Sequence, residues 1–152
     1  MRRSPIRPRA AILFACRDNG GLSLLAEALA HGRTPHLRAF SAGVQPGPVD
    51  LAAVECLHSA RIPVDGLSAK PLEVFSLPGA PRIDVVVSLV EGIEAEMESF
   101  ARRVRCIAHQ RWRLDDAAAL ADPHARRLAY RRLLPNLVSA ISELGRTHAF
   151  AA

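Results

Sequence analysis

The fold is decided by residues 11–30, which have the sequence AILFACRDNGGLSLLAEALA. Consecutive apolar residues over 10–16 predict a strand that is covered on both faces, as in a parallel sheet. Leucines and alanines over 22–31 recur at helical spacing and predict a helix that ends at Gly32. Cys16 is the last residue of the predicted strand. The stretch therefore predicts a strand, a tight glycine-containing loop and a helix, with a cysteine where the loop begins.

The loop after Cys16 has the features of an anion-binding site. A glycine-containing turn before a helix directs backbone N–H groups to one point, and the helix dipole adds positive potential there. A cysteine held at that point has its thiolate favoured, so its pKa falls and it becomes a nucleophile. We therefore predict that Cys16 is a catalytic nucleophile. The predicted anion-binding residues follow it directly: Arg17, Asp18, Asn19, Gly20, Gly21, Leu22 and Ser23.

Several of these residues also allow a purely structural interpretation. Asn19, Gly20 and Gly21 suit any turn that needs positive φ angles. Ser23 suits the N-terminal cap of the helix as well as a hydroxyl that supports the thiolate. Both interpretations of each position remain open from the sequence.

Strands and helices alternate along the rest of the chain. The patterns predict strands at 36–42, 83–89 and 103–108, helices at 50–60, 91–100 and 125–144, a short helical turn at 71–75, and a loop or partly helical segment at 109–123. Pro135 predicts a kink or break in the last helix, and Gly145 predicts its end. The alternation predicts an α/β fold of three layers, with a parallel sheet of about four strands and helices on both faces. We expect one domain over 10–147, a flexible basic tail at 1–9 and a second tail at 148–152.

Composition limits the kinds of site and partner that we expect. The chain of 152 residues has a formal net charge of +5, which suits an anionic ligand or partner. Its cysteines, Cys16, Cys56 and Cys106, are too widely spaced for a zinc motif or a disulfide framework, which favours a reduced, cytoplasmic setting and no metal site. The apolar run after the basic N-terminus is too short for a signal peptide or a membrane span. We expect no cofactor, no membrane partner and no specific nucleic-acid partner.

Four segments resemble the low-molecular-weight protein tyrosine phosphatases and the thioredoxin-coupled arsenate reductases that share their fold. Residues 13–23, LFACRDNGGLS, are similar in length to the family's Cys-x5-Arg-Ser loop and keep its cysteine, the asparagine three positions later and the serine. Residues 26–29, AEAL, resemble the family's following helix, and 40–44, FSAGV, its second strand and exit. Residues 112–117, WRLDDA, resemble the tryptophan segment that leads to its Asp-Pro general acid. The resemblance covers 10–145.

The resemblance implies a phosphoryl-transfer reaction with a covalent intermediate. The thiolate of Cys16 would attack phosphorus and form a phosphocysteine, while loop N–H groups and the family's arginine bind the equatorial oxygens. An aspartic acid on a separate loop would protonate the leaving oxygen, and water would then hydrolyse the thiophosphate. Spacing from Trp112 points to Asp116 as this acid, although a solvated loop residue is an equally simple interpretation. Asp115 and Asp122 are further candidates, and Asp122 has a proline after it but lies further along the chain.

The sequence departs from the family pattern at the position that matters most for this chemistry. Leu22 stands where the family has its arginine, and leucine cannot make bidentate contacts to an oxyanion. Losing a guanidinium that neutralises transition-state charge in phosphoryl transfer costs about 10³–10⁵ in rate. Arg17 is the only loop arginine, and reaching the anion from its position would require a different direction of approach. Ala117 replaces the proline after the candidate acid.

These departures predict a phosphatase-like protein with lost or altered phosphatase activity that binds a phosphate-like oxyanion or a phosphoprotein. The alternative is an active phosphatase or an arsenate reductase that uses Cys16 as its nucleophile. An arsenate reductase of the thioredoxin-coupled type needs two further cysteines in and after the segment that follows the third strand. Residues 88–93, SLVEGI, contain none, and Cys106 lies in the next predicted strand.

Overall fold

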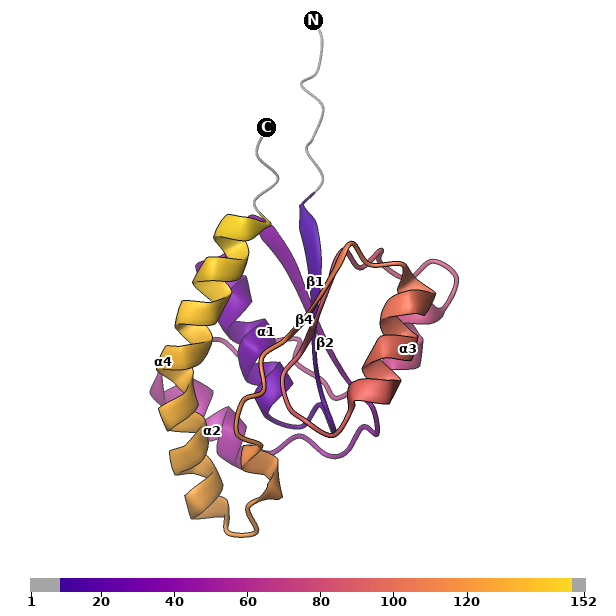
Figure 1. Cartoon of the computed structure of the whole chain (residues 1–152). Helices are drawn as coiled ribbons and strands as arrows, with labels where there is room; N and C mark the ends of the chain where they lie inside the picture. Colours follow the sequence, from indigo (N-terminus) through magenta and orange to yellow (C-terminus); the bar gives the residue numbers. More distant parts are fainter. Residues whose placement is uncertain (1–8, 149–152) are drawn as a thin grey trace, which may run out of the picture.

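The computed structural model describes residues 9–148, so nearly all of the two expected tails, 1–9 and 148–152, lies outside the described residues. Four parallel strands form one sheet in the order β2-β1-β3-β4: β1 Ala10–Cys16, β2 Leu37–Gly43, β3 Val85–Ser88 and β4 Ala108–Arg111. The helices are α1 Leu22–Arg33, α2 Leu51–Ser59, α3 Glu94–Val104 and α4 Pro123–Thr147, with short 3₁₀ turns η1 Leu72–Ser76 and η2 Ala117–Ala119. Helices α1, α2 and α4 cover one face of the sheet and α3 covers the other (Figure 1). The predicted three-layer α/β fold is confirmed.

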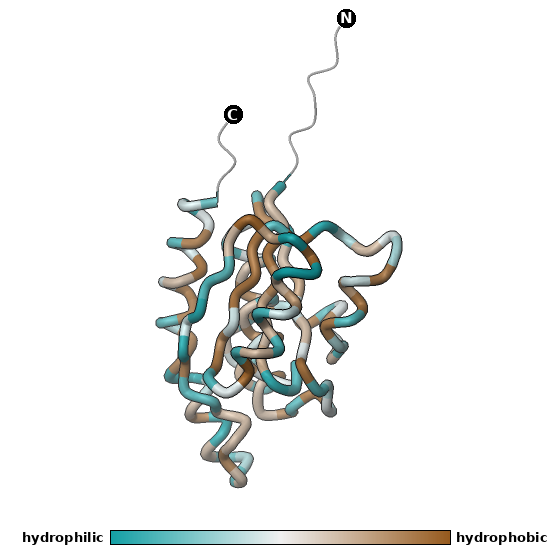
Figure 2. Tube along the Cα trace, turned by 45° about the vertical axis from the view of Figure 1, so that its right-hand side comes forward, coloured by the Kyte–Doolittle hydropathy of each residue, from teal (hydrophilic) through white to brown (hydrophobic). Residues whose placement is uncertain are grey.

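Strand β1 is at the centre of the sheet because all of its residues are apolar. Every residue of β1 is buried, and the strand pairs with β2 on one side and β3 on the other. The central strands stand out as the most hydrophobic part of the molecule in Figure 2. Parallel strands of this kind need cover on both faces, which α1 and α3 supply. The end of β1 is therefore rigidly placed, and with it the loop that follows.

The predicted strand at 103–108 is wrong. Helix α3 continues to Val104, and the last strand, β4, covers Ala108–Arg111, which the sequence pattern assigned mostly to a loop. Arg105 ends the helix with a positive φ of 53°, and its N–H donates to the carbonyls of Ala101 and Arg102. Because residues 105–107 form the turn between α3 and β4, the strand starts later than the alternation of side chains suggested.

Two glycines and a proline do not end helices as predicted. Gly32 lies inside α1, which continues to Arg33 because both the N–H and the hydroxyl of Thr34 donate to the carbonyl of Ala30. Gly145 lies inside α4, where a Cβ would come within 3.0 Å of the Thr34 methyl group. Pro135 also lies inside α4 without breaking it. Local hydrogen bonds from Thr34 therefore carry α1 past Gly32, whereas tertiary packing of α4 on α1 overrides the local preference of Gly145. In the described part of the chain, no helix is long and apolar enough to cross a membrane.

Candidate functional site

The loop at residues 16–22 lies at the carboxyl end of the central strand. Ligands of open parallel sheets bind at this edge. The backbone carbonyls of Cys16, Arg17 and Asp18 accept hydrogen bonds from the N–H groups of residues 44, 45 and 47, and the Gly20 carbonyl accepts one from the N–H of Asp50. In a trans peptide the carbonyl and the next N–H point in opposite directions. The N–H groups of residues 17, 18, 19 and 21 therefore face away from the 44–50 segment, as an anion cradle requires.

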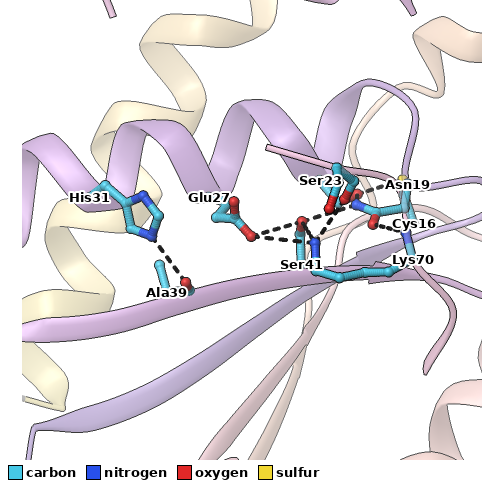
Figure 3. Close-up of polar contacts among 9 residues, drawn as sticks. Cys16, Asn19, Ser23, Glu27, His31, Ala39, Ser41 and Lys70 are labelled. Carbon is cyan, nitrogen blue, oxygen red and sulfur yellow. Dashed lines mark hydrogen bonds and ion pairs between the residues drawn. The ribbon is translucent and has the colours of Figure 1, made fainter. Parts of the chain in front are cut away.

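Asn19 shapes the loop in two ways. Its backbone has a positive φ of 52°, which asparagine tolerates better than most side chains. Its side-chain amide donates to the hydroxyls of Ser23 at 2.7 Å and Ser41 at 3.0 Å, and its carbonyl accepts from the Lys70 N–H at 2.9 Å (Figure 3). The asparagine is thus both a turn residue and the link between the loop and strand β2.

Ser23 supports the cysteine instead of capping the helix. The N-cap of α1 is Gly21, and no side chain caps this end of the helix. The Ser23 hydroxyl oxygen lies 3.0 Å from the Cys16 sulfur and accepts a hydrogen bond from Asn19. A serine hydroxyl can accept this bond and still donate its own proton, so the Ser23 hydroxyl can donate to the sulfur when the sulfur is ionised. The geometry favours the second of the two interpretations of Ser23.

The pKa of the Cys16 thiol shifts in the direction opposite to the one predicted from the sequence. Its side chain is buried, with 3% exposure, and this burial raises the pKa of the Cys16 thiol above its ordinary value. The Ser23 hydroxyl opposes the rise, whereas the negative charge of Asp18, whose Oδ1 is 3.8 Å from the sulfur, adds to it. The expectation that the pKa falls is therefore wrong, because the desolvation of the sulfur outweighs the donors of the loop.

A buried ion pair lies behind the loop, and sequence reasoning missed it. Glu27 of α1 is 5% exposed, and its Oε1 accepts the Ser41 hydroxyl at 3.0 Å and lies 3.8 Å from the Lys70 ammonium (Figure 3). Burial raises the pKa of Glu27, which Lys70 opposes, and burial lowers the pKa of Lys70. The signal in the sequence was a single acid among residues 22–30, which are apolar apart from it and Ser23, together with the only lysine of the chain. This pair extends the hydrogen-bonded chain from Cys16 into the space between α1 and β2.

Neither Leu22 nor Arg17 places a guanidinium inside the anion cradle. Leu22 starts α1 and is 3% exposed, in the hydrophobic core. Arg17 is exposed, and its guanidinium donates to the Glu91 carbonyl at 3.4 Å, in the turn after β3. A Cβ on Gly92 would come within 2.7 Å of that guanidinium, so the arginine rests on this turn.

The three candidate acids have different surroundings. The carboxylate of Asp122 accepts the N–H groups of His124 and Ala125 and so caps α4, with proline in the first turn. Asp116 is half-buried just before η2, and Asp115 is exposed. The structure therefore gives Asp122 a structural role and leaves Asp116 and Asp115 as candidates.

Tyr130 and Asp50 join the loop to the last helix, and neither was singled out from the sequence. The buried Tyr130 of α4 donates to Asp50 Oδ2 at 2.8 Å, and Arg126 donates to the same oxygen at 3.0 Å. Burial, followed by the hydrogen bond to Asp50, raises the pKa of Tyr130. A Cβ on Gly21 would overlap the Tyr130 hydroxyl, so only glycine fits there. Such a contact between distant segments leaves no local sequence signal.

A groove of about 670 Å³ adjoins the loop. Asp18 and Asp50 line it on the side of the loop and α2, and Ala118, His124 and Arg127 line the opposite side. Within residues 9–148, no group of three or more His, Cys, Asp or Glu side chains could hold a metal ion.

Comparisons with known proteins match this architecture. The family model described as low molecular weight phosphotyrosine protein phosphatase matches residues 11–146, whereas no curated protein matches the chain. An arsenate reductase solved in the phosphate binding state is 21% identical, with a TM-score of 0.68, over 91% of this chain and 98% of that one. Vibrio vulnificus Wzb, in complex with benzylphosphonate, is 16% identical, with a TM-score of 0.70, over 92% and 99%. The YwlE arginine phosphatase, in a mutant with a phosphorylated active-site serine, is 19% identical, with a TM-score of 0.63, over 88% and 95%.

The solved structures share the fold at identities too low to carry more than that. The family model covers nearly the whole chain, including the loop, and confirms the resemblance drawn from the sequence. The chain belongs to the low molecular weight phosphotyrosine protein phosphatase family.

Proposed function

We propose that this family member receives a phosphate-like oxyanion, free or carried by a phosphoprotein, at the loop 16–23 and has lost or altered its phosphatase activity. The observation that carries the proposal is Leu22, buried in the core at the position where the sequence resemblance places the family's arginine. Phosphoryl transfer relies on charge stabilisation around the transferred group, and removal of an arginine from this role costs about 10³–10⁵ in rate. Arg17, bonded to the turn after β3, does not replace it.

The state of the cysteine supports the same proposal. The thiolate is the nucleophile, and burial favours the neutral thiol of Cys16. A loop without its arginine also lacks the positive charge that would lower the pKa of this thiol. The proposed nucleophile is therefore weak at neutral pH, and Asp116 is the proposed acid for any remaining turnover.

The ligand class is supported by the loop geometry and by the neighbours. Backbone N–H groups of a loop before a helix bind phosphate-like anions. The arsenate reductase and Wzb structures hold phosphate and benzylphosphonate, respectively, and the YwlE mutant carries phosphate on its active-site serine. The three free cysteines of this chain support a reducing, cytoplasmic setting.

An arsenate reductase that relays a disulfide receives less support. Cys106 lies two residues before Ala108, which is level with Val85 and Ile12 in the sheet, whereas Cys16 lies four residues beyond Ile12. At about 3.3 Å per residue, the four residues from Ile12 to Cys16 alone span about 13 Å along the strand, and Cys106 precedes the level of Ile12 in the chain. A disulfide requires Cα atoms about 4.4–6.8 Å apart. Cys106 is therefore not placed to resolve a bond at Cys16.

Hydrolysis of p-nitrophenyl phosphate by wild type, Cys16→Ser and Leu22→Arg tests the proposal. We expect wild type to be close to Cys16→Ser, and Leu22→Arg to gain turnover. Ile107→Arg adds the same charge at a residue that is 60% exposed, before the start of β4 and away from the loop, and should gain nothing. Cys16-dependent turnover by wild type at about 1–10³ s⁻¹, the ordinary range of enzymes, would show the active alternative to be correct.

A further inference from the structure

A carboxylate of the loop itself lies where a bound anion would place an oxygen. Asp18 Oδ1 accepts the Gly20 N–H at 3.0 Å and lies 3.8 Å from the Cys16 sulfur. An oxyanion held in front of the sulfur by the loop would need an oxygen that accepts a hydrogen bond from a loop N–H and contacts the sulfur. Asp18 Oδ1 meets both conditions. The side chain is half-buried and also lines the neighbouring groove.

On the basis of the proposed function, we propose that Asp18 is a built-in occupant of the anion loop, which a ligand must displace. Displacement then weakens the binding of every phosphate-like anion, so that tight binding requires further contacts, such as those that the flanking residues of a phosphoprotein make in the groove. Asp18 thus sets the affinity of the loop for the phosphate group, and the groove supplies the preference between ligands.

The negative charge of Asp18 makes it costly for an anion to enter the loop. None of the ion pairs formed among residues 9–148 includes Asp18. The nearby cations have other partners, because Arg126 pairs with Asp50 and Arg17 bonds to the Glu91 carbonyl. A phosphate dianion entering the loop therefore meets an uncompensated negative charge, in a site without the family's arginine. Every phosphate-like anion suffers this repulsion, whatever group it is attached to.

The groove supplies the contacts that a free phosphate cannot use. Its volume of about 670 Å³ far exceeds that of a single tetrahedral oxyanion. Leu51, 73% exposed, provides an apolar surface there, and His124 and Arg127 provide polar groups, with Arg127 paired to Glu55 of the same groove. Contacts remote from the phosphate add binding free energy that offsets a fixed penalty at the loop. A phosphorylated segment of a protein can make such contacts, whereas inorganic phosphate cannot.

A simpler interpretation is that Asp18 only forms a turn. Aspartate side chains often bond the backbone N–H two residues later, and this geometry stabilises loops without any effect on a ligand. Asparagine forms the same turn without the charge. Asp18→Asn therefore separates the two interpretations, and Asp65→Asn removes the same charge from an exposed loop residue as a control.

The test is a titration with inorganic phosphate, followed by ³¹P NMR or calorimetry. We expect Asp18→Asn to bind phosphate at least tenfold more tightly than wild type, with Asp65→Asn unchanged; tenfold corresponds to about 1.4 kcal/mol. We expect wild type to bind a short phosphotyrosine peptide at least tenfold more tightly than phosphate. If wild type and Asp18→Asn bind phosphate equally well, the proposal that a ligand must displace Asp18 is overturned. If wild type binds the peptide and phosphate equally well, the proposed contribution of the groove is overturned.

A second variant protects the test against a folding defect. Asp18→Ser can still bond the Gly20 N–H through its hydroxyl, and it should show the same gain in phosphate affinity. If both variants lose the circular dichroism of the native fold, the charged carboxylate is a structural requirement and not a displaceable occupant, which overturns the proposal. Phosphate binding is measured without turnover. Hydrolysis of p-nitrophenyl phosphate by wild type would thus contradict only the proposed loss of activity. An unchanged phosphate affinity of the Asp18 variants would contradict only the proposed role of Asp18.

Discussion

Replacing Ser23 by alanine should make Cys16 less reactive, because the serine hydroxyl supports the ionised sulfur. The Ser23 oxygen is 3.0 Å from the sulfur and accepts a hydrogen bond from Asn19, and the hydroxyl can still donate its proton to an ionised sulfur. A hydrogen bond to a charged group is worth about 1.5–3 kcal/mol. Loss of that amount from the thiolate reduces its fraction about 10- to 100-fold at a fixed pH where the thiol predominates.

The alkylation rate of Cys16 measures this fraction, because iodoacetamide reacts with the thiolate. The rate at one fixed pH is followed by mass spectrometry of the Cys16 peptide, and the Cys56 and Cys106 peptides serve as internal references. Ser59→Ala makes the same replacement at an exposed position in α2 and should leave the rate unchanged. We expect Ser23→Ala to react about 10- to 100-fold more slowly.

A rate for Ser23→Ala equal to or above that of wild type would refute the reasoning. That result would mean that the hydroxyl does not donate to the sulfur, or that burial alone controls the ionisation of Cys16. Equilibrium unfolding of the variant in urea shows whether the protein remains folded under the assay conditions, since Asn19 loses one acceptor.

Two further predictions concern the support of the loop. Burial raises the pKa of Glu27, so the folded state holds more protons than the unfolded state above the ordinary glutamate pKa of about 4.3, and stability falls as pH rises through the raised value. Glu27→Gln keeps an acceptor for Ser41 and should lose this slope in urea unfolding at several pH values; parallel curves for the two proteins would contradict it. Gly21→Ala places a methyl group against Tyr130 and should reduce the free energy of unfolding by about 1–3 kcal/mol. Gly32→Ala, which meets no atom within 4 Å, should not destabilise, and equal stabilities of the two variants would show that the loop adapts.

The central architecture was predictable because its signals are local. The run of apolar residues over 10–16 matches β1, and the helical spacing that follows matches the start of α1 at Leu22. A buried parallel strand must be apolar throughout, so its sequence identifies it without knowledge of its neighbours. The carboxyl end of that strand then places Cys16 at the ligand-binding edge of the sheet.

Other elements were mispredicted where distant contacts decide the local structure. The strand predicted at 103–108 lies instead at Ala108–Arg111, because Arg105 ends α3 and the strand pairs with β3 from Val85 onward. Helix α4 passes Pro135 and Gly145 because it packs along its length against α1 and α2. Packing free energy from many side chains exceeds the few kcal/mol of an unfavourable residue.

The sequence by itself determined the family, the α/β class and the position of a cysteine at an anion loop, because spacing and residue type are local properties. It also determined that leucine stands where the family's arginine belongs. Only the tertiary structure decided how that loop behaves. The pKa of Cys16 rises because surrounding segments bury its sulfur, and Tyr130 reaches Gly21 from the last helix. The position of Asp18 Oδ1 within reach of both sulfur and backbone likewise depends on the folded loop. Desolvation and close approach depend on segments that are distant in the chain, and therefore appear only once it has folded.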